Sequence, residues 1–456
     1  MHRRRYALCR VAPWLLAALV AGLPSWASAQ NNTTAAGVTI NVNGLLERKS
    51  IDFSGQLFQV QSRASKTDLS SEVTASSKLR KVSLNRLEAA IDARHGVPTE
   101  EMRRLAGLQR CRYVFFYPES NDIVIAGPAE GWRTDMAGRV VGTGTGRPTL
   151  ELEDLIVALR AFPPGKSANK VIGCSIDPTP EGLASMQQFL RQVGGSATPG
   201  QTQYIVNGLR ESLGHQKISI NGVSPKTNFA RVLVEADYRM KLIGIGLENP
   251  PVKMVSFVEK ANPAAVSRNA LFRWYFIPDY ECVRMTHDRL AMELVGDGVK
   301  LVGEDEMVAS TGQRKSTNSG TNPASQAFVT SFTKRYPELA ARAPVYAELR
   351  NIIDLAVAAA FIQEQDYYGK AGWKMSLLGD EKRFAVETYN EPKMVESAVA
   401  AIWKGSRLTT PIGGGVHIEP TMALQRENLL DDEGGKVAKL RGPDKINLPA
   451  GRWWWD

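Results

Sequence analysis

One carboxylate in this sequence stands out because its surroundings are almost entirely apolar. Asp354 is the only charged residue between Ile352 and Ile362, inside the strongest helical pattern of the chain, residues 345–363. A helix that is apolar on all sides is buried, and an unpaired buried charge is very costly. We therefore expect Asp354 to be buried and paired, with Arg350, one helical turn earlier, as the candidate partner. An ion pair or a hydrogen bond to serine or tyrosine is favoured over catalysis.

The residue types that most often carry catalysis form no recognised motif. The histidines that follow the first 29 residues have no neighbour at metal-ligand spacing, and neither C-x-x-C nor G-x-S-x-G occurs. These histidines are His95, His215, His287 and His417. Ser167 and Lys170 match S-x-x-K by letter, but the companion motifs of that enzyme class are missing. The sequence assigns no catalytic residue, and we expect no cofactor and no metal ion.

A glycine-rich loop is the nearest approach to a phosphate-binding motif. Gly142, Gly144 and Gly146 lie between a short apolar stretch and a helix, where such loops also occur. The spacing is G-x-G-x-G, Pro148 intervenes, and no Gly-Lys-Ser/Thr sequence follows. A plain turn is therefore the favoured interpretation.

Three consecutive tryptophans, Trp453, Trp454 and Trp455, come just before the last residue, on an otherwise polar segment. Three exposed indole rings would favour aggregation. They either dock into a groove of this chain, which we favour, or form a short interaction motif for an envelope protein or a glycan.

The first 29 residues have the organisation of a secretory signal peptide. Four arginines precede an apolar run at residues 11–23, and Ala27 and Ala29 form the small-x-small pattern that signal peptidase cuts before Gln30. The arginines are Arg3, Arg4, Arg5 and Arg10. No later segment is long and apolar enough to span a bilayer. We expect a periplasmic or secreted protein without a transmembrane segment in the mature chain.

The composition is that of an ordinary globular protein. Of 456 residues, 43% are hydrophobic and 23% are charged. Without the four signal arginines, 52 basic residues face 47 acidic ones, and the mature chain has no block of five or six like charges. This balance does not favour a nucleic-acid partner.

Three cysteines remain after the signal, namely Cys111, Cys174 and Cys282, each in an apolar, strand-like context. Buried thiols are the favoured interpretation. A Cys111–Cys174 disulfide stays open as an alternative, because an exported protein can form one and spacing cannot decide.

The order of predicted elements favours an α+β protein, in which small mixed sheets pack with helices and a mainly helical C-terminal region follows. Shifts in composition divide the chain into an α+β unit at 30–195, a second α+β unit at 204–308, a linker loop at 309–325, a mainly helical region at 326–418 and a flexible tail at 419–456.

Some local patterns make narrower predictions. Thr149 is placed to cap a helix that runs to Phe162. Segments 272–277, 282–285 and 290–294 have the spacing of a three-stranded meander, and residues 394–404 have the pattern of a helix.

Several long stretches together resemble a known family. The chain resembles exported proteins of planctomycete bacteria that carry a large domain of unknown function, over roughly Leu79 to Ile418. The resemblance rests on YVFFYPESNDIVIAGPAEGW (Tyr113–Trp132), LEDLIVALRAF (Leu152–Phe162), IGCSIDPTPEGL (Ile172–Leu183), LVEADYRMKLIGIGLE (Leu233–Glu248) and ELRNIIDLAVAAAFI (Glu348–Ile362). It implies export and an integrated domain, and it implies no reaction and no residue role.

The leading functional expectation is a non-enzymatic binding or structural protein of the cell envelope. It depends on the export signal, the missing catalytic motifs and the aromatic tail. The alternative is an extracytoplasmic hydrolase with an unrecognised carboxylate or histidine site. A cleft with convergent carboxylates of shifted pKa would favour the hydrolase, and a flat aromatic or apolar surface would favour binding.

Overall fold

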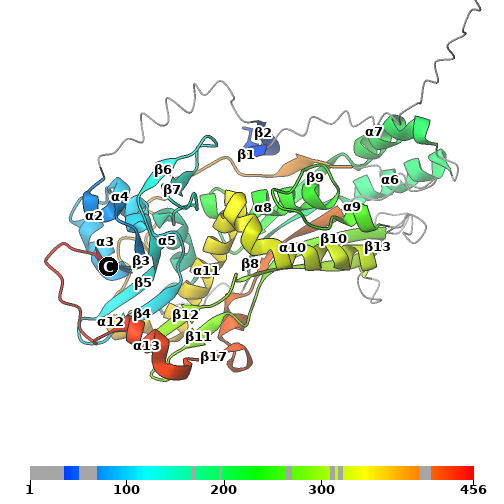
Figure 1. Ribbon diagram of the computed structural model, residues 1–456. Helices are drawn as coiled ribbons and strands as arrows, with labels where there is room; N and C mark the ends of the chain where they lie inside the picture. Colours follow the sequence, from blue (N-terminus) through cyan, green and yellow to red (C-terminus); the bar gives the residue numbers. More distant parts are fainter. Residues whose placement is uncertain are drawn as a thin grey trace, which may run out of the picture. The chain divides into compact units, whose positions relative to one another are not determined.

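Two large mixed sheets, with helices packed against them, make up most of the computed structural model (Figure 1). It describes residues 35–50, 69–165, 171–194, 198–261, 270–308, 314–316, 322–399 and 412–456. The predicted α+β class is confirmed. The predicted signal peptide and its cleavage residues Ala27, Ala29 and Gln30 lie outside the described residues. Within those ranges, no helix combines the length and the apolar character that a membrane span needs.

The larger sheet has nine strands. Its order is β1 (Ala35–Ile40), β2 (Leu45–Ser50), β15 (Met394–Glu396), β9 (His215–Asn221), β8 (Ile172–Asp177), β16 (Ile412–Ile418), β10 (Ala270–Pro278), β13 (Val299–Val308) and β14 (Arg314–Ser316). Two neighbouring pairs, β2–β15 and β10–β16, are parallel, and the other pairs are antiparallel.

Strand β16 is rich in glycine, and its glycines have a steric reason. A Cβ atom on Gly414 would lie 1.7 Å from the carbonyl oxygen of Trp274, and one on Gly415 would lie 2.0 Å from that of Cys174. Since real Cβ atoms never come so close, only glycine lets β16 pass between its two neighbours.

The smaller sheet has seven strands, and a separate two-stranded ribbon pairs β6 (Trp132–Thr134) with β7 (Val140–Gly142). The order of the seven is β17 (Leu430–Asp431), β11 (Val283–Met285), β12 (Ala291–Leu294), β4 (Tyr113–Tyr117), β5 (Asp122–Ala129), β3 (Ser77–Ser83) and β18 (Trp454–Trp455).

The longest helix forms the centre of the core. Helix α11 (Pro344–Glu364) is buried over nearly its whole length, as its apolar sequence predicts. It packs against α5 (Leu152–Ala161), α8 (Asn228–Gly244), α10 (Pro323–Arg342) and strand β4, and Figure 1 shows it among these elements. The other helices are α2 (Ser71–Thr74), α3 (Leu84–Asp92), α4 (Glu100–Arg103), α6 (Pro180–Val193), α7 (Thr202–Leu213), α9 (Phe257–Lys260), α12 (Tyr367–Ala371) and α13 (Lys436–Arg441).

The segment boundaries drawn from composition do not separate these sheets. The nine-stranded sheet combines strands from residues 30–195, 204–308 and 326–418, and residues 33–456 form one compact unit. In the predicted linker at 309–325, the described residues include strand β14 and the start of α10. The region 326–418 begins with helices, in keeping with the predicted mainly helical region, but also supplies β15 and β16.

Two local predictions are wrong because they assigned partners or type from nearby sequence alone. The expected meander does not form, since β10 belongs to the nine-stranded sheet whereas β11 and β12 belong to the seven-stranded one. Met394–Glu396 is strand β15 and not the start of a helix, because it pairs with β2 and β9. Residues 400–404 of that predicted helix lie outside the described residues.

The predicted flexible tail at 419–456 is folded onto the seven-stranded sheet. Strand β17 pairs with β11, helix α13 contacts β12, and β18 pairs with β3. This segment is polar in sequence, but its few apolar residues are spaced so that they cover the sheet.

Candidate active site

Asp354 is buried, with 2% of its surface exposed, and its partner is Arg110 and not Arg350. Arg110 donates from Nε at 2.6 Å and from Nη2 at 3.4 Å to the two carboxylate oxygens. Nε of Arg350 has no hydrogen-bond partner in the described part of the chain. Burial raises the pKa of Asp354, and Arg110 opposes this shift. The pair lies outside the cavity described below, so we assign it to structure.

The terminal tryptophans lie docked on this chain. Trp453 and Trp454 are 6% and 2% exposed, and β18 pairs with β3. The Trp454 indole donates to Glu101, and the guanidinium of Arg80 lies 4.5 Å from the ring centroid. The sequence left open whether the tryptophans dock on this chain or form an interaction motif for a partner, and in the structure they are docked.

The glycine-rich loop binds a carboxylate of this chain. Backbone N–H groups of Gly144 and Thr145 donate to Glu130 at 3.1 and 2.9 Å. Burial alone would raise the pKa of Glu130, but these bonds, together with those from the Thr145 hydroxyl and the Gln109 amide, lower it. The loop is therefore a turn that is closed around an internal anion.

The histidines and cysteines do not contribute to the cavity described below. Cys174 and His417 line a different, smaller pocket at β8 and β16, where His417 contacts Glu419 at the surface (Nε2–Oε1 2.6 Å). The described ranges contain no cluster of three or more His, Cys, Asp or Glu side chains that could hold a metal ion. The three cysteines are buried and free, so the Cys111–Cys174 disulfide is not formed. Ser167 and Lys170 lie outside the described residues.

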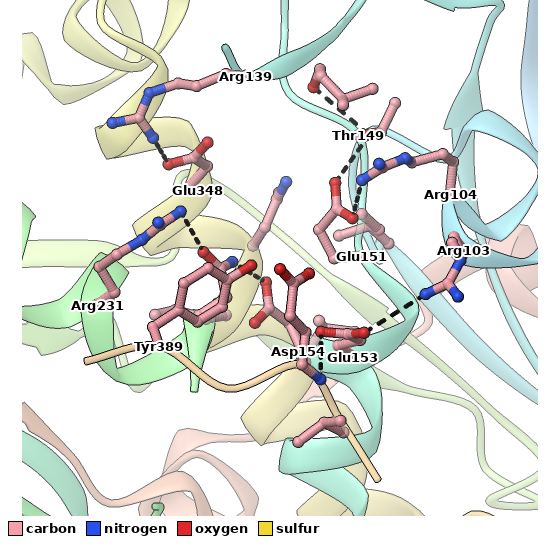
Figure 2. A pocket seen from close by; sticks show the side chains of 18 of the residues that line it. Arg103, Arg104, Arg139, Thr149, Glu151, Glu153, Asp154, Arg231, Glu348 and Tyr389 are labelled. Atoms are coloured by element: carbon pink, nitrogen blue, oxygen red, sulfur yellow. Dashed lines mark hydrogen bonds and ion pairs between the residues drawn. The ribbon is translucent and has the colours of Figure 1, made fainter. Parts of the chain in front are cut away.

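A cavity of about 650 Å³ is lined by residues of α5, α8 and α11, the end of α4 and the loop at 385–389 (Figure 2). This volume falls in the range of small-molecule sites. The wall is strongly polar and carries both signs of charge. Its ionisable residues are Arg103, Arg104, Arg139, Glu151, Glu153, Asp154, Arg231, Glu348, Glu387 and Tyr389.

Three of the acids come from the start of α5. Glu151 is the N-cap residue, and Glu153 and Asp154 belong to the first turn. The predicted cap, Thr149, instead donates to Glu151 Oε1 at 3.4 Å. The Glu151 side chain makes no capping bond with its own helix. It is therefore free to project into the cavity (Figure 2).

Arginines hold the carboxylates of the wall in place. Arg104 donates to Glu151 and, at 2.7 Å, to Glu100, while Arg139 bridges Glu348 and Glu235. Arg103 lies 3.6 Å from Glu153. Because each arginine restrains one or two acids, the site is organised before a ligand enters.

Asp154 differs from the other acids because half of its carboxyl group is unused. The residue is 6% exposed, its Oδ2 accepts from Asn228 Nδ2 at 2.9 Å, and its Oδ1 has no partner among the described residues. Arg231 fixes the orientation of the Asn228 amide, since it donates to Asn228 Oδ1 at 2.9 Å and arginine can only donate. A proton on Asp154 therefore belongs on Oδ1.

The two innermost carboxyl groups have strongly raised pKa values. Burial, reinforced by the charge of Glu151, raises the pKa of Asp154 to about 8. Burial raises the pKa of Glu151 to about 7, although Arg104 opposes the shift. The charge of Glu151 thus helps to keep Asp154 protonated at neutral pH.

This protonation predicts how stability depends on pH. The folded protein keeps the Asp154 proton between pH 4 and 8, whereas the unfolded chain, with an ordinary pKa of 3.8, loses it. Stability therefore falls as pH rises through this interval. Asp154→Asn removes the titration. We therefore expect the change in the free energy of unfolding that the substitution causes to be more favourable at pH 8 than at pH 5, by on the order of a few kcal/mol.

Urea denaturation of both proteins at pH 5 and pH 8 measures the effect. Asp92→Asn, at an aspartate with a 57% exposed side chain, is the matched control and should leave the pH dependence unchanged. Equal pH dependence of the wild type and Asp154→Asn would show that Asp154 is ionised in the folded state.

Sequence reasoning missed this site because acids in the first turn of a helix are ordinary, since they favour the helix dipole. One signal was available. Asp154 is followed at i+3, i+4 and i+7 by Val157, Ala158 and Ala161, so it lies on an apolar helix face. The same argument that singled out Asp354 applies to it.

Part of the chain matches a family model, described as "Protein of unknown function (DUF1598)", over residues 174–257. This agrees with the expected uncharacterised domain and does not address a planctomycete origin. The matched stretch contains Asn228 and Arg231 but not the acids of α5, and it assigns no reaction. Searches of curated proteins and of solved structures found no match.

Proposed function

We propose that the protein is a hydrolase of glycosidic bonds and that the cavity is its active site. The observation that carries the proposal is Asp154, a buried residue that lines the cavity together with Glu151 and whose Oδ1 has no hydrogen-bond partner in the described part of the chain. The predicted signal peptide would deliver this activity outside the cytoplasm.

In this proposal the two carboxyl groups divide the work of acid and base. Asp154 gives its Oδ1 proton to the leaving oxygen as the bond from the anomeric carbon to that oxygen breaks. Glu151, in its carboxylate form, which Arg104 stabilises, accepts a proton from the water that adds to the anomeric carbon. The products are a sugar and an alcohol, and the proton on Glu151 replaces the one that Asp154 lost.

The rest of the wall favours a substrate rich in hydroxyl groups. Asn351 is 4% exposed, and neither atom of its side-chain amide has a partner in the described part of the chain. Together with the carboxylates and arginines it offers both donors and acceptors, which sugar hydroxyls can satisfy. Tyr389 adds one aromatic ring to the wall.

We expect the wild type to hydrolyse at least one member of a panel of 4-nitrophenyl glycosides and Asp154→Asn to lose activity by roughly 10²- to 10⁴-fold. The kcat/KM of the wild type should rise as pH passes about 7, where Glu151 ionises, and fall as it passes about 8, where Asp154 loses its proton. Asp92→Asn should retain full activity, because its side chain is exposed and does not line the cavity.

Two results would contradict the proposal. One is a wild type that hydrolyses no member of the panel, and the other is an Asp154→Asn variant that hydrolyses it at the wild-type rate. In the first case the second candidate applies, a non-enzymatic glycan-binding protein of the envelope. The observation that favours it is that Arg104 and Arg139 pair with Glu151 and Glu348. A carboxylate paired with arginine still accepts hydrogen bonds from a glycan, but it is a weaker base for turnover.

A further inference from the structure

One arginine of the cavity differs from the rest. Arg103, Arg104 and Arg139 each have a carboxylate partner, whereas Arg231 makes no ion pair with any described residue. Among the described residues, its guanidinium donates one hydrogen bond, from Nη2 to Asn228 Oδ1. Since a guanidinium has five N–H donors, most of its capacity is unused.

Arg231 is nevertheless held in position. Its guanidinium carbon lies 4.5 Å from the centroid of the Tyr389 ring, which is a cation–π contact. The backbone N–H of Tyr389 donates to Lys226 at 2.8 Å, so the ring is attached to the turn that precedes α8. Arg231 is thus a positioned cation on the cavity wall and is not a freely rotating surface side chain (Figure 2).

We propose that Arg231 binds a carboxylate of the substrate, so that the site selects a sugar with an acidic group, such as a uronic acid. A carboxylate matches the planar guanidinium with two parallel hydrogen bonds. Arg231 also orients Asn228, which donates to Asp154. Asn228 therefore connects Arg231, and a carboxylate bound to it, with the proposed general acid Asp154. This inference rests on the proposed function, since it names the substrate class of the same site.

Binding tests the proposal without turnover. Methyl β-D-glucuronide and methyl β-D-glucoside differ in the carboxylate and hydroxymethyl groups at C6, and their affinities can be measured by ligand-observed NMR with the wild type. We expect the glucuronide to bind on the order of 10- to 100-fold more tightly, because charged hydrogen bonds are the stronger ones. Arg231→Met should abolish this preference, and Arg231→Lys should keep part of it. Arg335→Met, at an exposed arginine of α10, is the control that should keep all of it.

The ratio of the two affinities separates this role from a structural one. If Arg231 only oriented Asn228, its loss would weaken both glycosides equally and leave the ratio unchanged, which would overturn the proposal. Equal affinities in the wild type, or no glucuronide binding at high millimolar concentration, would also overturn it. Tighter binding of the 6-sulfate of the glucoside than of the glucuronide would overturn the carboxylate and show that Arg231 selects a sulfate.

Hydrolysis tests the proposed function separately. If the wild type cleaves a neutral glycoside and Asp154→Asn does not, the proposed hydrolase stands and the proposed selectivity for an acidic sugar fails.

Discussion

Asp354→Ala should lower the free energy of unfolding by about 3–5 kcal/mol, because it leaves the buried charge of Arg110 without a partner. Arg110 is 8% exposed, and its remaining bond, from Nη1 to the carbonyl of Gly296 at 2.8 Å, cannot neutralise a guanidinium. Guanidinium chloride denaturation measures the change. Asp354→Asn, which keeps the shape and one acceptor, should lose less and provides a folded variant if the alanine variant does not fold.

The matched control is a carboxylate that is paired at the surface. Glu338→Ala removes the partner of Arg335 on α10, where both side chains are almost half exposed, and we expect a loss below about 1 kcal/mol. Replacing both buried partners, as Arg110→Met with Asp354→Leu, should recover most of the stability, since an apolar pair replaces a desolvated ion pair. A loss of less than 1 kcal/mol for Asp354→Ala would mean that Arg110 finds water or another acceptor.

The two buried aspartates show why one is assigned to structure and the other to chemistry. Both lie on largely buried helices, and burial raises the pKa of both. Asp354 has both oxygens bonded to one arginine and lines no described cavity. Asp154 has an amide on one oxygen and no partner among the described residues on the other, and the residue lines a cavity that also contains Glu151. The free oxygen, and not the pKa alone, distinguishes a proton donor from a structural ion.

Local sequence determines much of the secondary structure and little of the strand pairing. The apolar run of α11 and the glycines of β16 identify these elements, because burial and close backbone approach are requirements that each segment meets by itself. The two partners of β10 could not be predicted together. One of them, β13, is nearby in sequence, but the other, β16, begins more than 130 residues later, and no local pattern connects it with β10. An alternating pattern defines the faces of a strand and not its neighbours.

The candidate site had the same limitation. The burial of Asp354 follows from its own helix, but Arg110 is 244 residues away in sequence and no spacing rule connects them. The cavity brings together the first turns of α5 and α8 with α11 and a loop near residue 387. Each contributing segment looks like an ordinary helix start or a polar loop. Only their convergence gives Asp154 its raised pKa and its free oxygen.

Trp454→Ala should also be costly, at about 3–5 kcal/mol, because it removes a large buried side chain and leaves a cavity beside β3. The indole covers Arg80, which is fully buried and bonded to Asp456 at 2.9 and 3.0 Å. Without the ring, Arg80 loses its cation–π contact, and we expect the Arg80–Asp456 pair to become open to water. Denaturation followed by far-UV circular dichroism measures the loss without relying on the deleted fluorophore.

Trp455→Ala is the matched control, since Trp455 is only partly buried and its ring contacts Tyr117 at a centroid distance of 6.3 Å. We expect it to lose about 1 kcal/mol, in keeping with one aromatic pair. If the two variants lost equally little, the tryptophans would not be held by the fold and could serve a partner, as the alternative from the sequence requires. A large difference would instead mean that a partner must first displace Trp454 from β3, at a cost in free energy of the same 3–5 kcal/mol, before it could bind the tail.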